Sequence, residues 1–526
     1  MASNKDIYGS KSVMSNMIWR FLERCGAQGV TFIVSIVLAR ILDPADYGLV
    51  ALVTVITTLM QVFVDSGFGS ALMQKKNPDN LDYSSVFYFN VVFCLFLYAV
   101  MFFAAPLIAW FYDKSELVLL VRVISLIIPI SALKNVQQSY VAKNMLFRKF
   151  FWATLGGTIG AAVIGITLAV LGYGVWALVW QMLFNVFVDT FILWIIVDWK
   201  PKWIFSFSRL RSLFKYGWKM LVSHLLDTTY NNLRSLIIGK KYESEDLAYY
   251  NKGNSFPNMF VTNINTSIDS VLLPSMASAQ DNPEKVKAMT RRAIKTASFI
   301  IMPMMMGLAA CATPMIRLLL TDKWLPCVFF LRVFCFTYAF FPIHTANLNA
   351  IKAMGRSDLF LKLEIIKKII GITAILITMW ISVEAMALSL LVVSVFNQIV
   401  NSWPNRRLLN YKYHDQLFDI LPNIVLTIAM GAIVFSITFF KLPDWLTLTI
   451  QVPLGIFVYF FGAWIFRLDS FVYCKNMAKT FFSRKKSPKT DDKKLDSEVQ
   501  SNEQISDSNT NEHSCSVENT EDGNNV

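Results

Sequence analysis

Residues 35–40 (SIVLAR) recur as residues 235–240 (SLIIGK), 200 positions further along the chain. Each copy lies in an apolar stretch, and each is followed six residues after its basic end by an aspartate. Later matches keep the same order with a drift of a few residues, as expected for an internal repeat. They pair Asp46 with Asp246, Asp65-Ser66 with Asp269-Ser270, Lys143-Asn144-Met145 with Lys352-Ala353-Met354, and Phe151 with Phe360. We therefore predict that the chain is a tandem duplication.

The composition indicates a membrane protein. Of 526 residues, 55% are apolar and 16% are charged, whereas soluble chains have about 45–50% and about 25%. The apolar residues fall into blocks of about 18–25 residues, long enough to cross about 30 Å of hydrocarbon as helix. We predict an all-α integral membrane protein with about 14 transmembrane helices. Their approximate spans are 17–41, 48–70, 85–110, 117–134, 151–171, 174–197, 213–238, 254–274, 295–316, 327–350, 362–381, 385–403, 420–440 and 445–466.

The offset of 200 residues places six helices in each repeat. Because six is even, both repeats start on the same side of the membrane and are parallel. The predicted parts are an N-terminal lobe (1–210, helices 1–6), a C-terminal lobe (211–415, helices 7–12), a helix pair (416–475, helices 13–14), and a basic, then acidic disordered cytoplasmic tail (476–526). Two parallel lobes with a cleft between them are typical of an alternating-access transporter.

The distribution of Lys and Arg predicts the orientation. The N-terminus and every second loop after it, a set that includes Lys134, hold 26 basic residues, whereas the alternate loops, which include Lys252, hold 10. This bias places both termini in the cytoplasm. The net charge of +13 is thereby explained by positive inner loops, and no nucleic-acid partner is expected.

Motifs for catalysis or for metal binding are missing from the sequence. The seven Cys include no CxxC pair, and the four His form no HExxH motif, which argues against a disulfide framework or a metal site. No cofactor is expected, and the chain is predicted not to be an enzyme. No cleavable signal pattern follows the polar residues 1–16, so the first helix is expected to be retained.

Polar side chains form a stripe on each of two equivalent helices. Helix 1 carries Arg20, Arg24 and Gln28 within one face, and helix 7 carries a broader stripe. Because polar groups facing lipid are costly, we predict that both stripes line the cleft and that their cations contact an anionic substrate. The alternative is that the two arginines snorkel at the membrane surface, with Glu23 and Asp227 as structural ion-pair partners. The candidates on helix 7 are Lys219, His224, Asp227, Asn231 and Arg234.

Two aspartates that match each other in the repeat lie at the ends of helices 2 and 8. Asp65 and Asp269 are candidates for carrying a coupling H+ or Na+, since a partly desolvated carboxylate can bind either ion. The alternative is a conformational role at the inner gate. Asp189 and Arg122 are lone charges inside other spans, and the sequence does not reveal their partners.

Four stretches of the chain resemble the bacterial polysaccharide exporters, the Wzx-type oligosaccharide-lipid flippases of the MOP superfamily. The resemblance extends over about residues 10–470, and it is strongest to exporters of the exopolysaccharide and colanic-acid type. The stretches are residues 39–48 (ARILDPADYG), 65–72 (DSGFGSAL), 273–277 (LPSMA) and 352–357 (KAMGRS).

The resemblance implies a MATE-like fold and a polyprenyl-pyrophosphate-linked oligosaccharide as substrate. It implies movement of that lipid from the cytoplasmic to the periplasmic leaflet of the inner membrane, for exopolysaccharide or lipopolysaccharide biosynthesis. Polysaccharide polymerase and export machinery are the implied partners beside the bilayer. Related lipid II flippases place cations of the first helix in the cleft, and Arg20 and Arg24 match these only by position.

Two other functions compete with this prediction. A MATE-like ion-coupled drug or cation antiporter favours buried carboxylates, and the cationic stripe of helix 1 counts against it. A membrane-embedded glycan polymerase or ligase usually carries a long outer loop or a large soluble domain, whereas every predicted outer loop here is short.

Overall fold

A computed structural model of the chain describes residues 10–65, 68–144 and 146–484. Within them, the side chains of residues 10–18, 20–25, 70, 147, 215–216 and 477–484 lie outside the description. The chain divides into two units, residues 1–462 and 463–526, and the site lies in the larger one. The predicted disordered tail from residue 485 onward lies outside the described residues.

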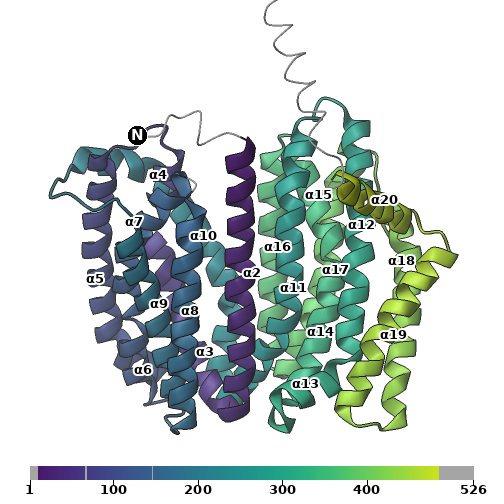
Figure 1. The fold of residues 1–526 in the computed structure, drawn as a ribbon, viewed down its shortest axis with the longest axis horizontal. Coiled ribbons are helices and arrows are strands. Elements are labelled where there is room, and N and C mark those ends of the chain that lie inside the picture. Colours follow the sequence, from purple (N-terminus) through teal and green to yellow (C-terminus); the bar gives the residue numbers. More distant parts are fainter. Residues whose placement is uncertain (1–9, 66–67, 145, 485–526) are drawn as a thin grey trace, which may run out of the picture. The chain divides into compact units, whose positions relative to one another are not determined.

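All regular elements among the described residues are helices, which confirms the predicted all-α fold (Figure 1). They are α2 (Ser10–Ile41), α3 (Pro44–Asp65), α4 (Phe68–Gln74), α5 (Asn80–Tyr112), α6 (Leu117–Ile124), α7 (Ile127–Lys143), α8 (Phe147–Val170), α9 (Val175–Ile196), α10 (Phe207–Lys241), α11 (Ser244–Ala277), α12 (Pro283–Ala310), α13 (Ala312–Leu320), η1 (Asp322–Trp324), α14 (Cys327–Ala339), α15 (Phe341–Ala353), α16 (Ser357–Thr378), α17 (Val383–Leu408), α18 (Tyr413–Ser436), η2 (Ile437–Phe440), α19 (Asp444–Ile465) and α20 (Asp469–Arg484).

Ten helical segments of the described chain are long and apolar enough to cross a membrane. Four further long helices, α2, α10, α11 and α16, are not among the ten. Every predicted span overlaps one of these fourteen segments. The count of fourteen membrane crossings stays a prediction. Two of the four, α2 and α10, are the helices whose polar stripes are predicted to face a wet cleft rather than lipid.

The structure places the matched residues of the repeat at equivalent helix ends. Arg40 lies in the last turn of α2 and Lys240 in the last turn of α10. Asp46 lies in the first turn of α3, and Asp246 lies in the first turn of α11. Cations at helix C-termini and anions at N-termini both complement the helix dipole. The repeated sequence therefore encodes the same helix–turn–helix boundary twice.

Residues 171–174 form the turn between α8 and α9. Gly172 and Gly174 adopt positive φ angles of 81° and 53°, a conformation that costs glycine little and other residues more. The two helices consequently pack side by side, and α2 packs along α8.

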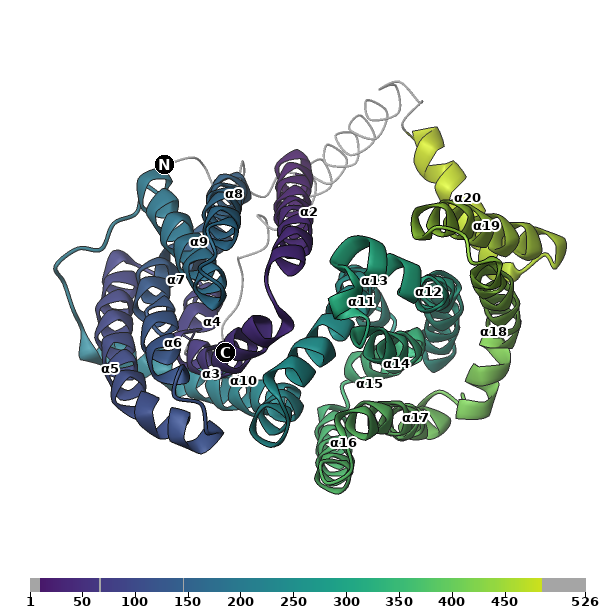
Figure 2. The same ribbon diagram turned by 90° about the horizontal axis from the view of Figure 1, so that it is seen from below.

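The helices form two bundles within residues 1–462. Figure 2 shows helices α2–α9 gathered on one side, with α10 beside α3, and α11–α17 on the other. One apolar core lies among α4, α5, α7, α8, α9 and the start of α10, and another lies among α11, α12, α15 and α18. A third core contains residues of both bundles, including Leu52 of α3, Leu247 of α11 and Phe334 of α14. The residue boundaries predicted for the two lobes remain a prediction.

Candidate functional site

Helix α10 connects the two bundles and carries most of the predicted site. Ser206 caps its start by accepting a hydrogen bond from the backbone N–H of Arg209. Its first turns pack on the first bundle, where Leu213 is buried and the ring of Phe214 lies 5.9 Å from that of Phe68. Its last turns contact the second bundle, where Tyr242 donates a hydrogen bond to the carbonyl of Met379. A single helix of 35 residues therefore presents polar side chains to both bundles.

A polar cavity of about 630 Å³ lies beside α10. Helices α3, α7, α8 and α10 and the start of α4 supply its walls. Asp65, the last residue of α3, faces it and accepts a 3.0 Å hydrogen bond from Asn135 Nδ2. His224 and Thr228 of α10 line the opposite wall. The cavity brings the predicted Asp65 and His224 together, a proximity that the sequence did not reveal.

Asp269 has a related environment in the second bundle. Its Oδ1 accepts a 2.6 Å hydrogen bond from Asn349 Nδ2 of α15. The sequence places Asp269 at the end of a helix, but this is wrong because α11 continues to Ala277. Each bundle thus holds one exposed aspartate of the repeat through an asparagine of a later helix.

The charges on the second half of α10 are paired with helices of the second bundle. Asp227 forms an ion pair with Lys368 of α16. Arg234 is buried, and its Nη2 donates a 3.2 Å hydrogen bond to Ser389 Oγ of α17. The side chain of Arg234 is therefore packed in the second bundle and does not extend as a free cation into an open cleft.

The remaining candidates are exposed or lie beyond the description. Gln28 of α2 accepts a 2.8 Å hydrogen bond from Asn263 of α11, which joins the two bundles. Lys219 and Asn231 are exposed on α10. Arg20 and Arg24 belong to the helical backbone of α2, but their side chains lie outside the described part.

The bundles pack tightly at the end formed by the C-terminus of α2 and the N-termini of α3 and α11, which we call the packed end. Gly48 of α3 approaches the first residue of α11 so closely that an added Cβ would lie 1.8 Å from Ser244 O. Gly239 of α10 similarly meets Leu52 of α3, at 2.0 Å from its Cδ2. Only glycine permits such approaches, because any side chain would overlap atoms of the opposite helix.

Hydrogen-bond donors of the second bundle cover backbone carbonyls of α2 at the packed end. Trp324 Nε1 donates to Ala39 O at 2.7 Å, and Lys323 Nζ donates to Leu42 O at 2.5 Å. In return, Arg40 donates to the carbonyls of Leu318 and Leu319 at the end of α13. Helix C-terminal carbonyls have no partner within their own helix, so these contacts satisfy both helix ends.

Lys252 is a buried residue of the packed end that the sequence analysis missed. Its Nζ donates to Ser35 O at 3.2 Å and to Ser35 Oγ at 3.1 Å. It also lies 5.1 Å from the ring centroid of Tyr47 and 5.5 Å from that of Trp324. The assignment of Lys252 to a loop is wrong, because α11 begins at Ser244. The acidic pair Glu243 and Asp246, which forms a capping box, was the available signal for that early start.

One of the two lone charges has an ion-pair partner in the structure. Asp189 of α9 pairs with Lys134 at 2.6 Å, so the loop assignment of Lys134 is also wrong: it lies inside α7. Arg122 instead donates to Phe102 O at 3.3 Å and stacks 4.3 Å from the centroid of its ring.

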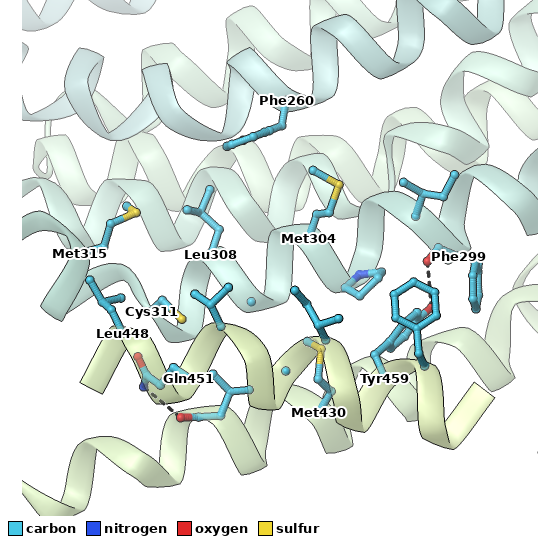
Figure 3. Close-up of a pocket in the computed structure, with 18 residues that line it drawn as sticks. Phe260, Phe299, Met304, Leu308, Cys311, Met315, Met430, Leu448, Gln451 and Tyr459 are labelled. Atoms are coloured by element: carbon cyan, nitrogen blue, oxygen red, sulfur yellow. Dashed lines mark hydrogen bonds between the residues drawn. The ribbon is translucent and has the colours of Figure 1, made fainter. Parts of the chain in front are cut away.

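An apolar cavity of about 580 Å³ lies between α12 and the helices α18 and α19 (Figure 3). Phe260, Met304, Leu308 and Met430 are among the side chains on its walls. Among its few polar groups, Gln451 Nε2 donates a 2.9 Å hydrogen bond to Val434 O. Such a surface suits a hydrocarbon chain and not a glycan.

Metal chemistry finds no support among the described residues. No three His, Cys, Asp or Glu side chains of the described chain gather closely enough to hold a metal ion.

Known proteins resemble this chain in sequence and in fold. The family described as "Polysaccharide biosynthesis protein" matches residues 37–329. The succinoglycan biosynthesis transport protein ExoT of Rhizobium meliloti is 26% identical over 316 residues, which are 60% of this chain and 64% of ExoT. The chain therefore matches less than two thirds of ExoT. The teichuronic acid biosynthesis protein TuaB of Bacillus subtilis is 22% identical over 417 residues, covering 77% of this chain and 85% of TuaB.

A solved structure shares the fold. The lipid II flippase MurJ in an inward closed conformation superposes with a TM-score of 0.71 at 18% identity, covering 86% of this chain and 98% of MurJ. The chain therefore shares the fold of MurJ.

Proposed function

Because this chain belongs to the polysaccharide biosynthesis protein family, we propose that it flips a polyprenyl-pyrophosphate-linked oligosaccharide across the bacterial inner membrane. The lipid moves from the cytoplasmic to the periplasmic leaflet and supplies exopolysaccharide or lipopolysaccharide synthesis. ExoT, a relative over 60% of this chain, is described as a transport protein.

The observation that carries this proposal is the contrast between the two ends of α3. At Gly48 the bundles are in backbone contact, whereas a polar cavity surrounds Asp65. The two residues are separated by about 26 Å along the helix. A transporter that works by alternating access needs one closed end and, at the other end, a polar space for a hydrophilic headgroup. The two ends of α3 fit this arrangement. By the loop-charge bias, the packed end is periplasmic and the cavity opens toward the cytoplasm.

Each part of the substrate has a matching surface. The glycan matches the polar cavity at Asp65. The pyrophosphate matches the cations predicted for the cleft, namely Arg20 and Arg24 of α2 and the exposed Lys219 of α10. The polyprenyl chain matches the apolar cavity lined by α12, α18 and α19.

The proposed activity breaks no covalent bond, so the chain acts as a transporter and not as an enzyme. Its partners are the lipid-linked oligosaccharide, the bilayer and, downstream, a polysaccharide polymerase and export machinery. No nucleic acid is involved.

Coupling to a proton or sodium gradient is part of the proposal, with Asp65 and Asp269 as the candidate carriers. Asp227 is a weaker candidate because Lys368 already neutralises it. Collapsing both gradients in reconstituted vesicles is expected to stop net flipping; unaffected flipping contradicts coupling.

The two rival functions are less well supported. A drug antiporter shares the fold, but the family match is to polysaccharide biosynthesis proteins. A glycan polymerase or ligase needs a site for covalent chemistry, and the described residues that line the polar cavity include a single carboxylate.

Deletion of the gene tests the proposal. Lipid-linked oligosaccharide is expected to accumulate on the cytoplasmic leaflet and to clear when the gene is restored. Leaflet location can be measured by the access of a membrane-impermeant lectin or periodate in right-side-out and inverted vesicles. Unchanged glycans together with altered drug tolerance would instead support the antiporter.

The cationic part of the proposal has its own test. The double variant Arg20→Ala with Arg24→Ala is expected to lose complementation of the deletion while reaching wild-type levels in the membrane. Full complementation by that variant contradicts a role for these arginines.

A further inference from the structure

The polar cavity at Asp65 has a composition that distinguishes among the parts of a glycolipid. Amide and hydroxyl side chains dominate its polar lining, and among the described residues Asp65 is the single carboxylate and His224 the single imidazole. None of the described residues that line it is Lys or Arg. Because proteins bind phosphates through cations, this cavity does not suit the pyrophosphate.

Amides and hydroxyls each both donate and accept hydrogen bonds, as sugar hydroxyl groups do. They come from several helices: Gln61 from α3, Asn135 and Gln138 from α7, Thr154 from α8 and Thr228 from α10. The volume of about 630 Å³ lies within the usual range of ligand pockets, roughly 300–1,000 Å³. The cavity therefore surrounds its contents with hydroxyl-compatible groups on several sides.

Asp65 is held as an oriented acceptor inside this cavity. Asn135 Nδ2 donates to its Oδ1 at 3.0 Å, and Gln61 is a second side-chain hydrogen-bond partner. An ionised carboxylate offers about four lone-pair sites, so capacity remains for groups that enter the cavity. A sugar hydroxyl can donate to the carboxylate while a neighbouring hydroxyl accepts from an adjacent amide.

Apolar side chains complete the cavity. Phe150 of α8 and Leu221 of α10 are part of its walls. A sugar ring presents C–H groups on its faces and hydroxyls at its rim, so a wall that mixes apolar and amide groups fits a pyranose better than a hydrated ion.

We propose that this cavity is a sugar-binding subsite in which Asp65, oriented by Asn135, accepts hydrogen bonds from hydroxyls of the transported glycan. The inference rests on the proposed flippase function and assigns one part of the substrate to one cavity. It differs from the coupling role considered for Asp65, because a cation site requires close oxygen ligands around a small ion, and this cavity is far larger.

Binding measurements with two lipids test the assignment. The first probe is the lipid-linked oligosaccharide extracted from cells that lack the transporter, and the second is undecaprenyl pyrophosphate without a glycan. Purified full-length protein in nanodiscs is titrated with each. Asp65→Asn is expected to weaken binding of the glycan-bearing lipid about tenfold, the effect of losing a charged hydrogen-bond acceptor. Binding of undecaprenyl pyrophosphate is expected to stay within about twofold.

Two further variants control for folding and for charge. Asp198→Asn makes the same chemical change at an exposed residue outside the cavity, and both affinities are expected to remain at wild-type values. Thr228→Val removes one hydroxyl from the cavity wall without touching the Asp65–Asn135 pair. It is expected to weaken binding of the glycan-bearing lipid about fivefold, the effect of one neutral hydrogen bond.

The outcomes separate the two levels of the proposal. If wild-type protein neither binds nor flips the glycan-bearing lipid, the proposed function itself fails. If it binds and flips that lipid, but Asp65→Asn weakens both probes equally or weakens neither, the sugar subsite is wrong. Loss of sodium- or proton-dependent flipping in Asp65→Asn with unchanged glycan affinity also overturns it, in favour of an ion site.

Discussion

The packed end and the polar cavity share helices α3 and α10 but are built from different chemical groups. At the packed end, helix termini meet each other: Gly48 contacts the backbone of Ser244, and Trp324 covers a carbonyl of α2. At the cavity, side chains project from within helices, and the amides of Gln61 and Asn135 hold Asp65. The packed end is therefore held together by close contact between backbones, which small residues and helix ends permit. The cavity depends instead on individual polar side chains.

The largest effect is expected from Gly48→Ala. The new Cβ would overlap Ser244 O, a backbone atom that cannot move without α11. We expect a loss of about 3 kcal/mol or more from packing at this end, at the upper limit of ordinary overpacking. Thermal unfolding in detergent measures it.

Gly29→Ala is the matched control, because a Cβ at Gly29 meets nothing within 4 Å. This substitution is expected to be neutral or slightly stabilising, since alanine favours helix by up to about 1 kcal/mol over glycine. Equal behaviour of the two variants would show that the packed end tolerates separation.

A smaller effect is expected from Lys252→Met, which keeps the length of the side chain but removes its hydrogen bonds to Ser35. A hydrogen bond from a charged donor is worth about 1.5–3 kcal/mol, so the packed end should open more often. The buried Ala39, changed to cysteine, serves as a reporter, and its reaction with a maleimide in open membrane fragments is expected to accelerate at least tenfold.

Lys202→Met, in the loop before α10, is the control for Lys252→Met and should leave the reaction of the reporter unchanged. A variant Lys252→Met whose reporter reacts at the wild-type rate contradicts the role of Lys252 in closure.

Trp324→Phe is expected to act in the same direction but more weakly. It retains an aromatic ring against Tyr47 and loses the donor to Ala39 O. One neutral hydrogen bond contributes about 1 kcal/mol, so the reporter should react about fivefold faster. If the reporter reacts faster in Trp324→Phe than in Lys252→Met, Trp324 contributes more to closure than Lys252, contrary to this prediction.

The smallest effect is expected from Asp227→Asn, away from the packed end. Asp227 is 53% exposed in its side chain and pairs with a partly exposed Lys368, and such pairs contribute about 0.2–1 kcal/mol. A double-mutant cycle with Lys368→Met isolates this coupling, which should shrink as salt is added. A coupling above about 2 kcal/mol would indicate a more desolvated pair than the exposure implies.

The candidate site was predicted in part. The sequence identified Asp65 and His224 separately, because charged or polar residues in apolar stretches are conspicuous. It could not reveal that they share one cavity, since α3 and α10 are more than 140 residues apart. It also missed Lys252, because a helix that starts early at a capping box looks like a polar loop when judged by hydropathy.

The sequence by itself determined the helices, the repeat and the class of protein. These properties are local or periodic: apolar runs specify helices that cross a membrane, and Arg40 and Lys240 mark equivalent helix ends. Only the tertiary structure decided which polar groups are paired, which face a cavity and which end is packed. Those properties depend on contacts between helices that are distant in sequence, where a single glycine such as Gly48 sets how closely two backbones approach.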